Sequence, residues 1–262
     1  MQNPSITKFA LIPKKDDISQ KTAATLQKSL LAAGFTENND TPDLVVVVGG
    51  DGSMLYAAQR YLNQLDHLVF IGIHTGTLGF FMDYTKDEIP AFISDLTSKQ
   101  GTIHTFPLLK AIVGKKKLYA INEVRIENPM RTQDVTIYLN NLEFETLRSS
   151  GLCVSTQLGS TAYNRSLNGP ILEENLPALV LTEIAGIHHH KFKSIGVPYV
   201  MKDTTEITIS ANDFEGAYLG VDSIGMKLDG AGEVIIKKSQ NKQFNMLRLR
   251  PISHFERLSR ML

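Results

Sequence analysis

The sequence LVVVVGGDGS, residues Leu44–Ser53, decides how the first part of the chain folds. Five apolar, β-prone residues predict a strand that is buried on both faces, and the glycines at 49, 50 and 52 end it before a helical pattern begins. Glycine lets the backbone adopt positive φ and approach a ligand closely, and free N–H groups at a helix start can bind an anion such as phosphate. We therefore expect a strand, a glycine turn and a helix start that together form a candidate ligand site.

Asp51 is the one ionisable side chain in this turn. A carboxylate beside a phosphate is electrostatically unfavourable unless it accepts a proton, binds a metal or holds a sugar hydroxyl. Asp51 is therefore a candidate catalytic residue, and the alternative is a tight turn in which it only caps the next helix. The sequence has neither a GxxxxGK[ST] nor a GxGxxG motif, so a phosphate site here must differ from those of P-loop and Rossmann proteins.

The segments on either side of this stretch alternate between strand and helix patterns. The predicted strands are Thr7–Pro13 and Leu68–Ile73, and the predicted helices are Asp17–Ala33, Met54–Leu65 and about Thr85–Thr97. A second glycine-containing turn, HTGTLGFF at residues 74–81, follows the second strand. The alternation predicts an α/β fold with a doubly wound parallel sheet. Such sheets bind ligands at the carboxyl ends of their strands, where both turns are expected.

From about Gly101 onward, the alternation of strands and helices gives way to short segments in which apolar and polar residues alternate. The predicted strands are Ile103–Val113, Leu118–Glu127, Val135–Leu139, Leu142–Leu147, Thr204–Ala211, Tyr218–Asp222, Glu233–Lys238 and Phe244–Arg250. Turn signals such as Asn140-Asn141 separate them, and residues 253–262 predict a short amphipathic helix. We expect an N-terminal α/β domain (residues 1–100) that carries the GGDGS loop and a β-rich, sandwich-like domain (101–245). A C-terminal segment (246–262) is expected to return to the N-terminal domain.

The composition limits the kinds of partner. The 262 residues include 27 basic and 27 acidic side chains, so no basic field points to a nucleic acid or a membrane, and small molecules are the expected ligands. No window approaches the apolar length of a membrane span. The lone Cys153 can form neither an internal disulfide nor a cysteine-based metal site. These features predict a soluble, cytoplasmic protein in which Cys153 is a small, buried apolar residue.

Two further polar motifs lie in the predicted β-rich domain. Asn122-Glu123 falls in the middle of an otherwise apolar strand, where a polar pair costs free energy unless it has partners. It is either a hydrogen-bonded core pair or part of a site. In STQLGSTAY, residues 155–163, small hydroxyl groups beside Gly159 can bind phosphate or ribose oxygens, and Tyr163 can pack against a base. The alternative for this segment is a strand, a turn and a helix cap with no ligand.

The clusters of histidine and lysine point to solvent rather than to a metal. His188, His189 and His190 are adjacent, so they cannot all face one ion, and no carboxylate lies at ligand spacing. We expect them to join Lys191 and Lys193 in a cationic rim, near phosphates or at a subunit contact. Lys115–Lys117 is expected to be an exposed hairpin turn.

In their order along the chain, these motifs resemble those of the NAD kinase family. The matching motifs are GGDGS at 49–53, HTGTLGF at 74–80, NE at 122–123, STQLGSTAY at 155–163, NGP at 168–170 and LTEIA at 181–185. A single GGDG is not specific, because diacylglycerol kinases and 6-phosphofructokinases carry similar loops, but the ordered set covers nearly the whole chain. The resemblance implies transfer of a phosphoryl group from ATP, or in some members polyphosphate, to the 2'-hydroxyl of the adenosine ribose of NAD, giving NADP.

The resemblance also implies roles for individual residues. Asp51 looks like the general base of the family, and Gly52 is its loop neighbour. The other residues implied in NAD binding are Asn122, Glu123, Arg148, Ser150, Thr161, Ala162, Tyr163, Ser166, Ala185, Asp222 and Ser223. Mg²⁺ or another divalent cation would act together with ATP, and no set of protein metal ligands is implied. The resemblance further implies a homotetramer with sites near subunit boundaries.

Six residues, at four places in the chain, depart from the usual pattern of the family. Ser149-Ser150 replaces Gly-Asp, Gln157-Leu158 replaces Pro-Thr, His74 replaces Asn, and Ser223 replaces Gly. They bear on affinity and the donor site rather than on the reaction class. Two alternatives remain: a lipid or sugar kinase with the same loop, which leaves the STQLGSTAY segment without a role, and an NAD(P)-binding sensor without turnover.

Overall fold

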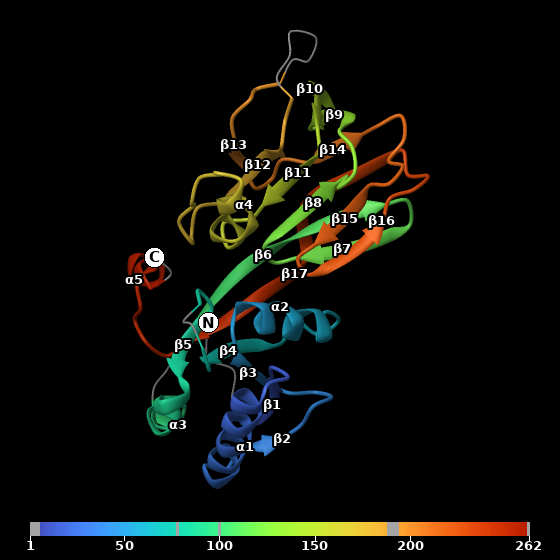
Figure 1. The fold of residues 1–262 in the computed structure, drawn as a ribbon. Coiled ribbons are helices and arrows are strands. Elements are labelled where there is room, and N and C mark those ends of the chain that lie inside the picture. The colour runs from blue at the N-terminus through green and yellow to red at the C-terminus, as the bar shows by residue number, and fades with distance from the viewer. Residues whose placement is uncertain (1–5, 77–78, 99–100, 188–193, 261–262) are drawn as a thin grey trace. The chain divides into compact units, whose positions relative to one another are not determined.

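The computed structural model describes residues 6–76, 79–98, 101–187 and 194–260 (Figure 1). The chain divides into an α/β unit, residues 1–106 and 242–262, and a β-rich unit, residues 107–241. The boundaries expected from the sequence, at residues 100 and 245, differ from these because two long strands, β6 (Thr102–Val113) and β17 (Glu233–Arg248), continue without interruption past the divisions. An uninterrupted strand pattern carries no signal for a domain boundary.

The α/β unit contains most of the helices that the structure describes. Its other elements are β1 (Lys8–Pro13), α1 (Asp17–Ala32), β2 (Thr36–Glu37), β3 (Leu44–Gly49), α2 (Asp51–Arg60), β4 (Val69–His74), β5 (Met82–Thr85), a 3₁₀ helix (Lys86–Glu88), α3 (Ile89–Ser98) and α5 (His254–Ser259). Strands β2, β1, β3, β4 and β5 lie in that order and are parallel, and Met246 of β17 pairs in parallel with Phe70 of β4. The predicted α/β fold with a parallel sheet is confirmed.

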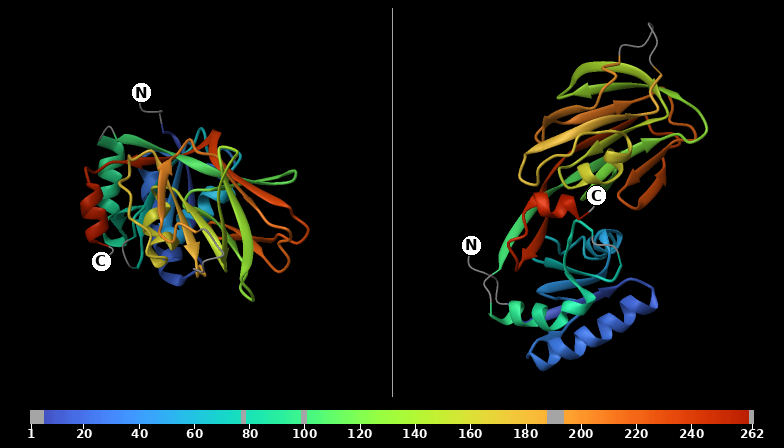
Figure 2. Two further views of the ribbon diagram at one scale, coloured as in Figure 1. Left: turned by 90° about the horizontal axis from the view of Figure 1, so that it is seen from above. Right: turned by 60° about the vertical axis from the view of Figure 1, so that its left-hand side comes forward.

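Helices cover both faces of this sheet. Strand β3 is buried along its whole length, as its run of valines predicts. Leu26 of α1 and Phe92 of α3 pack with Val46 of β3 in one apolar core, so α1 and α3 share a face. Gly72 of β4 faces α2, because a Cβ placed there would lie 3.2 Å from the Met54 Cε atom. Figure 2 shows α1 and α3 on one side of these strands and α2 on the other.

The β-rich unit is a sandwich of two sheets. Its other elements are β7 (Lys116–Ala120), β8 (Glu123–Glu127), β9 (Gln133–Leu139), β10 (Leu142–Ser149), β11 (Gly151–Ser155), a 3₁₀ helix (Gly159–Thr161), α4 (Tyr163–Ser166), β12 (Ala178–Ile184), β13 (Tyr199–Lys202), β14 (Ile207–Ser210), β15 (Tyr218–Val221) and β16 (Ile224–Lys227). One sheet has the order β10-β9-β14-β17, and the other has the order β13-β12-β11-β8-β15-β16. Ile137 and Ile209 of the first sheet share one core with Val124 and Val154 of the second, so the predicted sandwich-like domain is confirmed.

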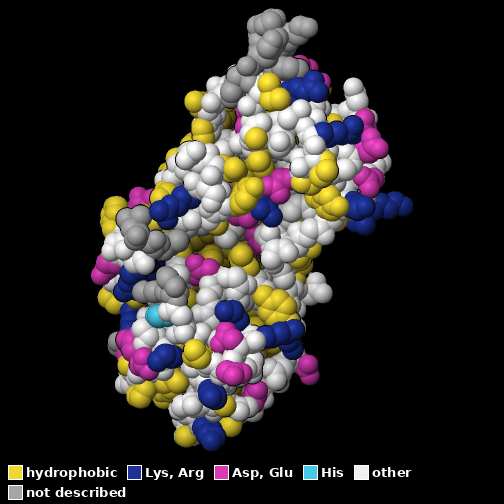
Figure 3. All heavy atoms as spheres, in the orientation of Figure 1, with side chains coloured by type: hydrophobic (Ala, Val, Ile, Leu, Met, Phe, Trp, Pro, Cys, Tyr) yellow, Lys and Arg dark blue, Asp and Glu magenta, His cyan; other side chains and the backbone are white. Residues whose placement is uncertain are grey.

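Several local predictions are confirmed. Asn140 and Asn141 both have positive φ, 51° and 67°, as a two-residue hairpin turn requires. Lys115–Lys117 is exposed, and Cys153 is free and fully buried. Within the described residues, no helix is both long and apolar enough to cross a bilayer. Figure 3 shows acidic and basic side chains interspersed over the face in view, in keeping with the balanced charge.

Other element predictions are wrong in their limits. The helix expected to reach Leu65 ends at Arg60, and the residues that follow form turns whose carbonyls accept hydrogen bonds from side chains of β17. Lys242 donates to the Leu62 carbonyl at 2.7 Å and Asn245 to the Leu65 carbonyl at 3.2 Å. The two strands expected at residues 233–238 and 244–250 are one strand, β17. The strands that were not predicted include β2, β5, β12, β13 and β16.

Candidate active site

The glycine turn after β3 places Asp51 as the first residue of α2. Gly50, not Asp51, is in the N-cap position, so the alternative in which Asp51 only caps the helix is wrong. The carboxylate of Asp51 instead accepts two backbone hydrogen bonds from the second predicted turn. The Phe80 N–H donates to Oδ2 at 2.8 Å, and the Phe81 N–H donates to Oδ1 at 3.1 Å. The GGDG and HTGTLGFF turns therefore meet at this carboxylate.

Gly79 is what lets the two turns come this close. A Cβ at this position would lie 2.2 Å from the Asp51 Oδ1 atom, which is far inside van der Waals contact. Only glycine avoids this clash, since it alone lacks a Cβ. Thr77 and Leu78 of the same motif lie outside the described residues.

The pKa of Asp51 reflects two opposing influences. Burial raises the pKa of the carboxyl above its usual value, because desolvation disfavours the charged form. The N–H groups of Phe80 and Phe81 oppose this rise by stabilising the carboxylate. The positive charges of Arg248 and Arg257 act in the same lowering direction. The result is a carboxylate that binds protons more tightly than an exposed aspartate, as suits a general base.

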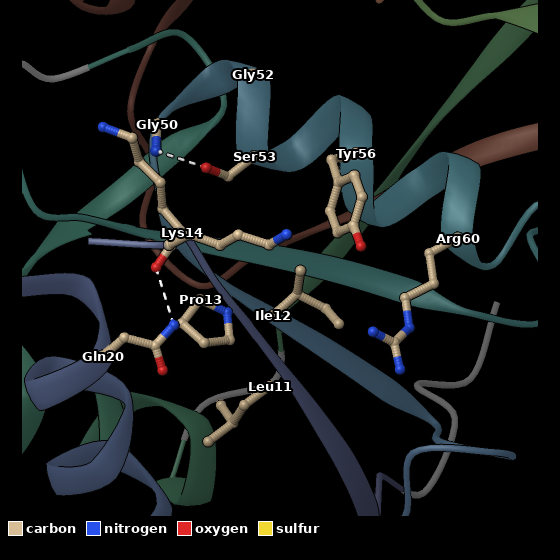
Figure 4. A pocket seen from close by; sticks show the side chains of 11 residues that line it. Leu11, Ile12, Pro13, Lys14, Gln20, Gly50, Gly52, Ser53, Tyr56 and Arg60 are labelled. Atoms are coloured by element: carbon tan, nitrogen blue, oxygen red, sulfur yellow. Dashed lines mark hydrogen bonds between the residues drawn. The ribbon is translucent and has the colours of Figure 1, made fainter. Parts of the chain in front are cut away.

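A cavity of about 780 Å³ opens beside the same glycine turn (Figure 4). It is lined by Leu11, Ile12, Pro13, Lys14, Lys15, Gln20, Gly50, Gly52, Ser53, Tyr56 and Arg60. Tyr56 and Arg60 lie four residues apart on α2, and Figure 4 shows both projecting toward the strand that carries Ile12. The Tyr56 side chain is 54% exposed. The cavity thus combines an accessible aromatic ring, three cationic side chains and the backbone of the glycine turn.

In the β-rich unit, Asp222 shapes the backbone around Asn122 and Glu123. Its Oδ2 atom accepts from the Ile121 N–H at 2.8 Å, and its Oδ1 atom accepts from the N–H groups of Asn122 at 2.9 Å and Glu123 at 3.2 Å. These bonds hold residues 121–122 in a bend between β7 and β8. The prediction of one continuous strand from Leu118 to Glu127 is therefore wrong, because a carboxylate takes N–H groups that a strand would use in a ladder.

The bend leaves buried acceptors without partners. Asn122 is 7% exposed and Glu123 is 6% exposed, and neither Asn122 Oδ1 nor Glu123 Oε2 has a hydrogen-bond partner among the described residues. Burial, and after it the neighbouring charge of Asp222, raises the pKa of Glu123 to about 7. Burial also raises the pKa of Asp222 to about 6, against the three N–H groups that lower it. Buried acceptors without partners are costly, which indicates a site for a hydrogen-bond donor.

The STQLGSTAY segment packs against this bend. The Thr156 hydroxyl donates to the Ile121 carbonyl at 2.6 Å and accepts from the Gly159 N–H at 3.1 Å. A Cβ at Gly159 would lie 2.1 Å from the Asn122 carbonyl oxygen, so only glycine fits here. Ser155 of β11 pairs with Glu123 of β8 across the sheet. The structure thus brings the Asn-Glu pair and this segment together.

Tyr163 occupies a polar setting beside the same strands. Its hydroxyl donates to Glu127, and the Arg125 guanidinium lies 4.4 Å from the centre of its ring. Burial, followed by the hydrogen bond to Glu127, raises the pKa of Tyr163 to about 12. The neighbouring predicted site residues differ in exposure: Thr161 is buried, Ala162 is half-buried, and Ser166 is exposed.

Three predicted residues form a separate group at the other end of β11. The Ser150 N–H donates to the Ile184 carbonyl at 3.0 Å, next to Ala185, which has a positive φ of 49°. Arg148 is exposed and its Nε atom lies 3.5 Å from Asp134. Ser223, beside Asp222, is exposed on the turn between β15 and β16. The histidine cluster and the lysines at 191 and 193 lie outside the described residues.

The comparisons with known proteins identify the family. Residues 121–249 match the family model described as the ATP-NAD kinase C-terminal domain. NAD kinase 1 from Bacillus cereus is 32% identical over 257 residues, covering 96% of this chain and 97% of that protein. The chain belongs to the NAD kinase family. NAD kinase from Lactobacillus johnsonii is a further relative, 37% identical over 207 residues, or 77% of each chain.

Solved structures of NAD kinase relatives share the fold. A yeast NADH kinase, crystallised with NADH, superimposes with a TM-score of 0.82 at 17% identity and covers 94% of this chain and 84% of that one. An NAD kinase from Archaeoglobus fulgidus, crystallised with ATP, gives a TM-score of 0.76 at 24% identity and covers 96% of both chains. The predicted family and fold are both confirmed.

Three of the residues that depart from the NAD kinase pattern are buried, and one of them, Ser149, is 0% exposed. Gln157 and Leu158, which stand where Pro-Thr is usual, are 7% and 3% exposed, and Gln157 Oε1 has no hydrogen-bond partner among the described residues. His74 closes a short loop, with Nδ1 2.9 Å from the Gly76 carbonyl oxygen. The replacement of Pro-Thr therefore alters the interior of the STQLGSTAY turn and not only its surface.

Some residues that contact or surround the candidate site residues were not predicted from the sequence. Thr156, Arg125 and Glu127 organise the β-rich unit around the predicted positions, and Arg248 and Arg257 place positive charge near Asp51. Arg257 had one signal in the sequence, a charged residue in the middle of a short amphipathic helix. Arg125, Glu127 and Arg248 are strand residues whose partners are remote in sequence, and Thr156 belongs to the STQLGSTAY motif without being singled out within it.

Proposed function

We propose that this protein is an NAD kinase that transfers a phosphoryl group from ATP, or polyphosphate, to the 2'-hydroxyl of the adenosine ribose of NAD. The observation that carries the proposal is the Asp51 carboxylate. It stands at the glycine turn of a chain that belongs to the NAD kinase family and is held by the N–H groups of Phe80 and Phe81. A carboxylate fixed in this way can accept the hydroxyl proton as the oxygen attacks the terminal phosphorus atom of the donor. The bond from this phosphorus to the bridging oxygen breaks, and ADP, or the shortened polyphosphate, leaves.

The raised pKa of Asp51 supports its role as general base. A stronger base takes a hydroxyl proton more readily, provided that it is still ionised at the working pH. Burial supplies the extra basicity, and the two N–H groups together with Arg248 and Arg257 limit the rise. Phosphoryl transfer has a loose transition state, so positioning and charge neutralisation supply most of the remaining acceleration.

The cavity beside the glycine turn is proposed to take the phosphoryl donor. Lys14, Lys15 and Arg60 supply positive charge for a polyphosphate chain, and the Gly50–Gly52 backbone can approach it closely. Tyr56 offers a ring against which a purine can stack. A volume of about 780 Å³ falls in the range of small-molecule sites. These features also suit inorganic polyphosphate, which lacks a base.

A divalent cation is proposed to enter with the donor. The described residues contain no group of three His, Cys, Asp or Glu side chains able to hold a metal. Mg²⁺ keeps several waters when bound and takes many of its ligands from substrate phosphates, so the ion is proposed to arrive on the phosphates of ATP. When bound, the ion would neutralise charge on the transferring phosphoryl group.

The buried acceptors of the β-rich unit are proposed to recognise adenosine. Asn122 Oδ1 and Glu123 Oε2 can accept hydrogen bonds from ribose hydroxyls or the adenine amino group. The other proposed contacts to NAD are Gly52, Arg148, Ser150, Thr161, Ala162, Tyr163, Ser166, Ala185, Asp222 and Ser223. Asp222 would act through the bend, because its carboxylate already binds three N–H groups.

Location and assembly are also proposals. The single, buried and unpaired Cys153 supports a reducing compartment such as the cytoplasm. Exposed apolar side chains such as Phe144 and Val200 support contact with further copies of the chain, and the family resemblance favours a homotetramer. Light scattering of the purified protein would measure the assembly.

The decisive experiment is a coupled assay of NADP formation from NAD and ATP with Mg²⁺. We expect turnover by the purified protein and loss of turnover in Asp51→Asn. Binding of NAD without NADP formation, with either ATP or polyphosphate as donor, would support the sensor alternative and contradict the proposal. NADP-forming activity unaffected by Asp51→Asn would leave the reaction in place and remove Asp51 from it.

A further inference from the structure

The C-terminal helix α5 buries a charged side chain. Arg257 is 2% exposed, although it lies in a helix of six residues. Its Nη1 atom donates to the Phe80 carbonyl at 3.1 Å and to Asp83 Oδ1 at 2.5 Å. Burial of a guanidinium costs free energy unless it is paired and hydrogen-bonded, so these two contacts account for its position.

Asp83 ties this helix to a second arginine. Its side chain is fully buried, and Oδ1 also accepts from Arg248 Nη1 at 2.9 Å. Arg248 ends β17, Asp83 lies in β5, and Arg257 lies in α5, so one carboxylate fixes residues from three elements of the α/β unit. Neither arginine can shift without breaking a buried ion pair.

One peptide unit connects Arg257 to Asp51. The carbonyl of Phe80 and the N–H of Phe81 belong to the same planar group and point in opposite directions. Arg257 binds the oxygen of this group, and the Phe81 N–H donates to Asp51 Oδ1 at 3.1 Å. Fixing the oxygen therefore fixes the orientation of the N–H, and a cation on the oxygen strengthens the N–H as a donor.

We infer that Arg257, anchored by Asp83, is a positioning residue for the reaction and holds the Phe80–Phe81 peptide in the orientation that aligns the Asp51 carboxylate. The inference rests on the proposed function, because it concerns the base of that reaction. The charged groups that face Asp51 within the described α/β unit include Arg248 from β17 and Arg257 from α5, and both lower its pKa. The carboxylate of Asp83 offsets part of their positive charge.

The test is the pH dependence of kcat for NADP formation in three variants. Arg257→Met removes a hydrogen bond to the Phe80 carbonyl, so kcat should fall about tenfold with little change in the KM for NAD. It also removes a positive charge near Asp51, so the acid limb of the profile, where kcat falls as Asp51 is protonated, should move to higher pH by about half a unit or more. Arg257→Lys keeps the charge and should return the limb toward that of the wild type. Asp83→Asn leaves both arginines without their counter-charge and should move the limb to lower pH.

Arg250→Met is the matched control. Arg250 lies in the same C-terminal segment, pairs with Glu88 at 2.7 Å and Asp95 at 3.3 Å, and stacks on Tyr84. Its loss should lower stability without moving the acid limb. If Arg257→Met does not fold, the downward shift in Asp83→Asn still tests the inference.

The outcomes separate the inference from the proposed function. An active wild-type enzyme whose acid limb stays in place in both Arg257→Met and Asp83→Asn overturns the inference alone. The same shift in Arg250→Met as in Arg257→Met also overturns it, because the effect would then be a general result of destabilisation. A wild-type protein that forms no NADP overturns the proposed function and the inference with it.

Discussion

The two units each hold an aspartate carboxylate on backbone N–H groups, but they use it differently. Asp51 binds two N–H groups with separate oxygens, at a turn beside an open cavity. Asp222 binds three N–H groups and is itself 5% exposed. Burial raises the pKa of both. A raised pKa alone therefore does not distinguish the carboxylate proposed as the general base from the carboxylate that holds a bend of the backbone.

The strongest test of this comparison is Asp51→Asn. An amide cannot accept the hydroxyl proton, so kcat should fall by about 10²-fold or more, the range expected for loss of a general base. The fold and nucleotide binding should persist, because an asparagine oxygen can still accept one of the two N–H bonds. Steady-state kinetics and thermal unfolding measure the two effects, and near-normal turnover would remove Asp51 from the mechanism.

Asp222→Asn should show the reverse pattern. The amide nitrogen cannot accept a hydrogen bond, so at least one of the N–H groups of residues 121–123 loses its acceptor inside the protein. The free energy of unfolding should fall by about 2 to 3 kcal/mol, the cost of an unsatisfied buried donor. Urea unfolding would measure this change. Unaltered stability would show that the bend does not depend on the carboxylate.

Asn122→Ala tests whether the bend serves recognition. Removing a side chain that hydrogen-bonds the substrate leaves a substrate group unpaired. The value of kcat/KM for NAD should therefore fall by a factor that corresponds to about 1 to 3 kcal/mol of lost transition-state stabilisation. Because the Asn122 backbone already binds Asp222, the stability should change little. A loss of stability with unchanged NAD kinetics would instead make this side chain structural.

Glu123 makes a pH-dependent prediction. Its pKa rises from 4.5 to about 7 on folding, so the folded chain retains a proton that the unfolded chain releases at lower pH. The contribution of Glu123 to stability is fully present below about pH 4.5 and is lost as the pH rises through about 7. Glu123→Gln should therefore gain about 2 to 3 kcal/mol of stability relative to the wild type between pH 5 and pH 8. Equal pH profiles of urea unfolding would contradict the raised pKa.

Ser150→Asp should have the smallest effect. Many NAD kinases have aspartate at this position, and a carboxylate accepts a stronger hydrogen bond than a hydroxyl. If Ser150 contacts NAD away from the transferring group, the KM for NAD should fall several-fold, corresponding to about 1 kcal/mol, while kcat stays nearly constant. Kinetics at saturating ATP and varied NAD measure this. An unchanged or higher KM would mean that the family role of this position does not carry over to the serine.

The sequence predicts local periodicity well and remote partners poorly. The buried strand β3, the glycine turn and the sandwich follow from apolar patterns and turn residues, because those signals lie within a few neighbouring positions. The early end of α2 and the break at Asn122 could not be predicted in this way. The break at Asn122 depends on Asp222, which lies 100 residues further along the chain. The turns after α2 are contacted by Lys242 and Asn245 of β17, which are also remote in sequence.

In the candidate site too, contacts between residues that are remote in sequence could not be predicted from local patterns. Asp51, Asn122 and Glu123 are predicted as site residues because their polarity stands out from their surroundings in the sequence. Gly79 was visible only as part of a motif, and its purpose, to admit the Asp51 carboxylate, depends on a contact across 28 positions of sequence separation (79 − 51). Arg257 acts through a peptide bond, which no side-chain pattern records.

The discontinuous make-up of the α/β unit has a consequence for the order of synthesis. Residues 1–106 leave the ribosome first, but Arg248 and Arg257, which belong to the same unit, follow only after residues 107–241. The ion pairs of Asp83 and the last parallel strand beside β4 therefore close over a long stretch of intervening chain. Closure of such long loops raises contact order and slows folding. The glycine turn is therefore synthesised well before Arg248 and Arg257. Residues 107–241 of the β-rich unit must also be synthesised before these two positive charges can take their places near Asp51.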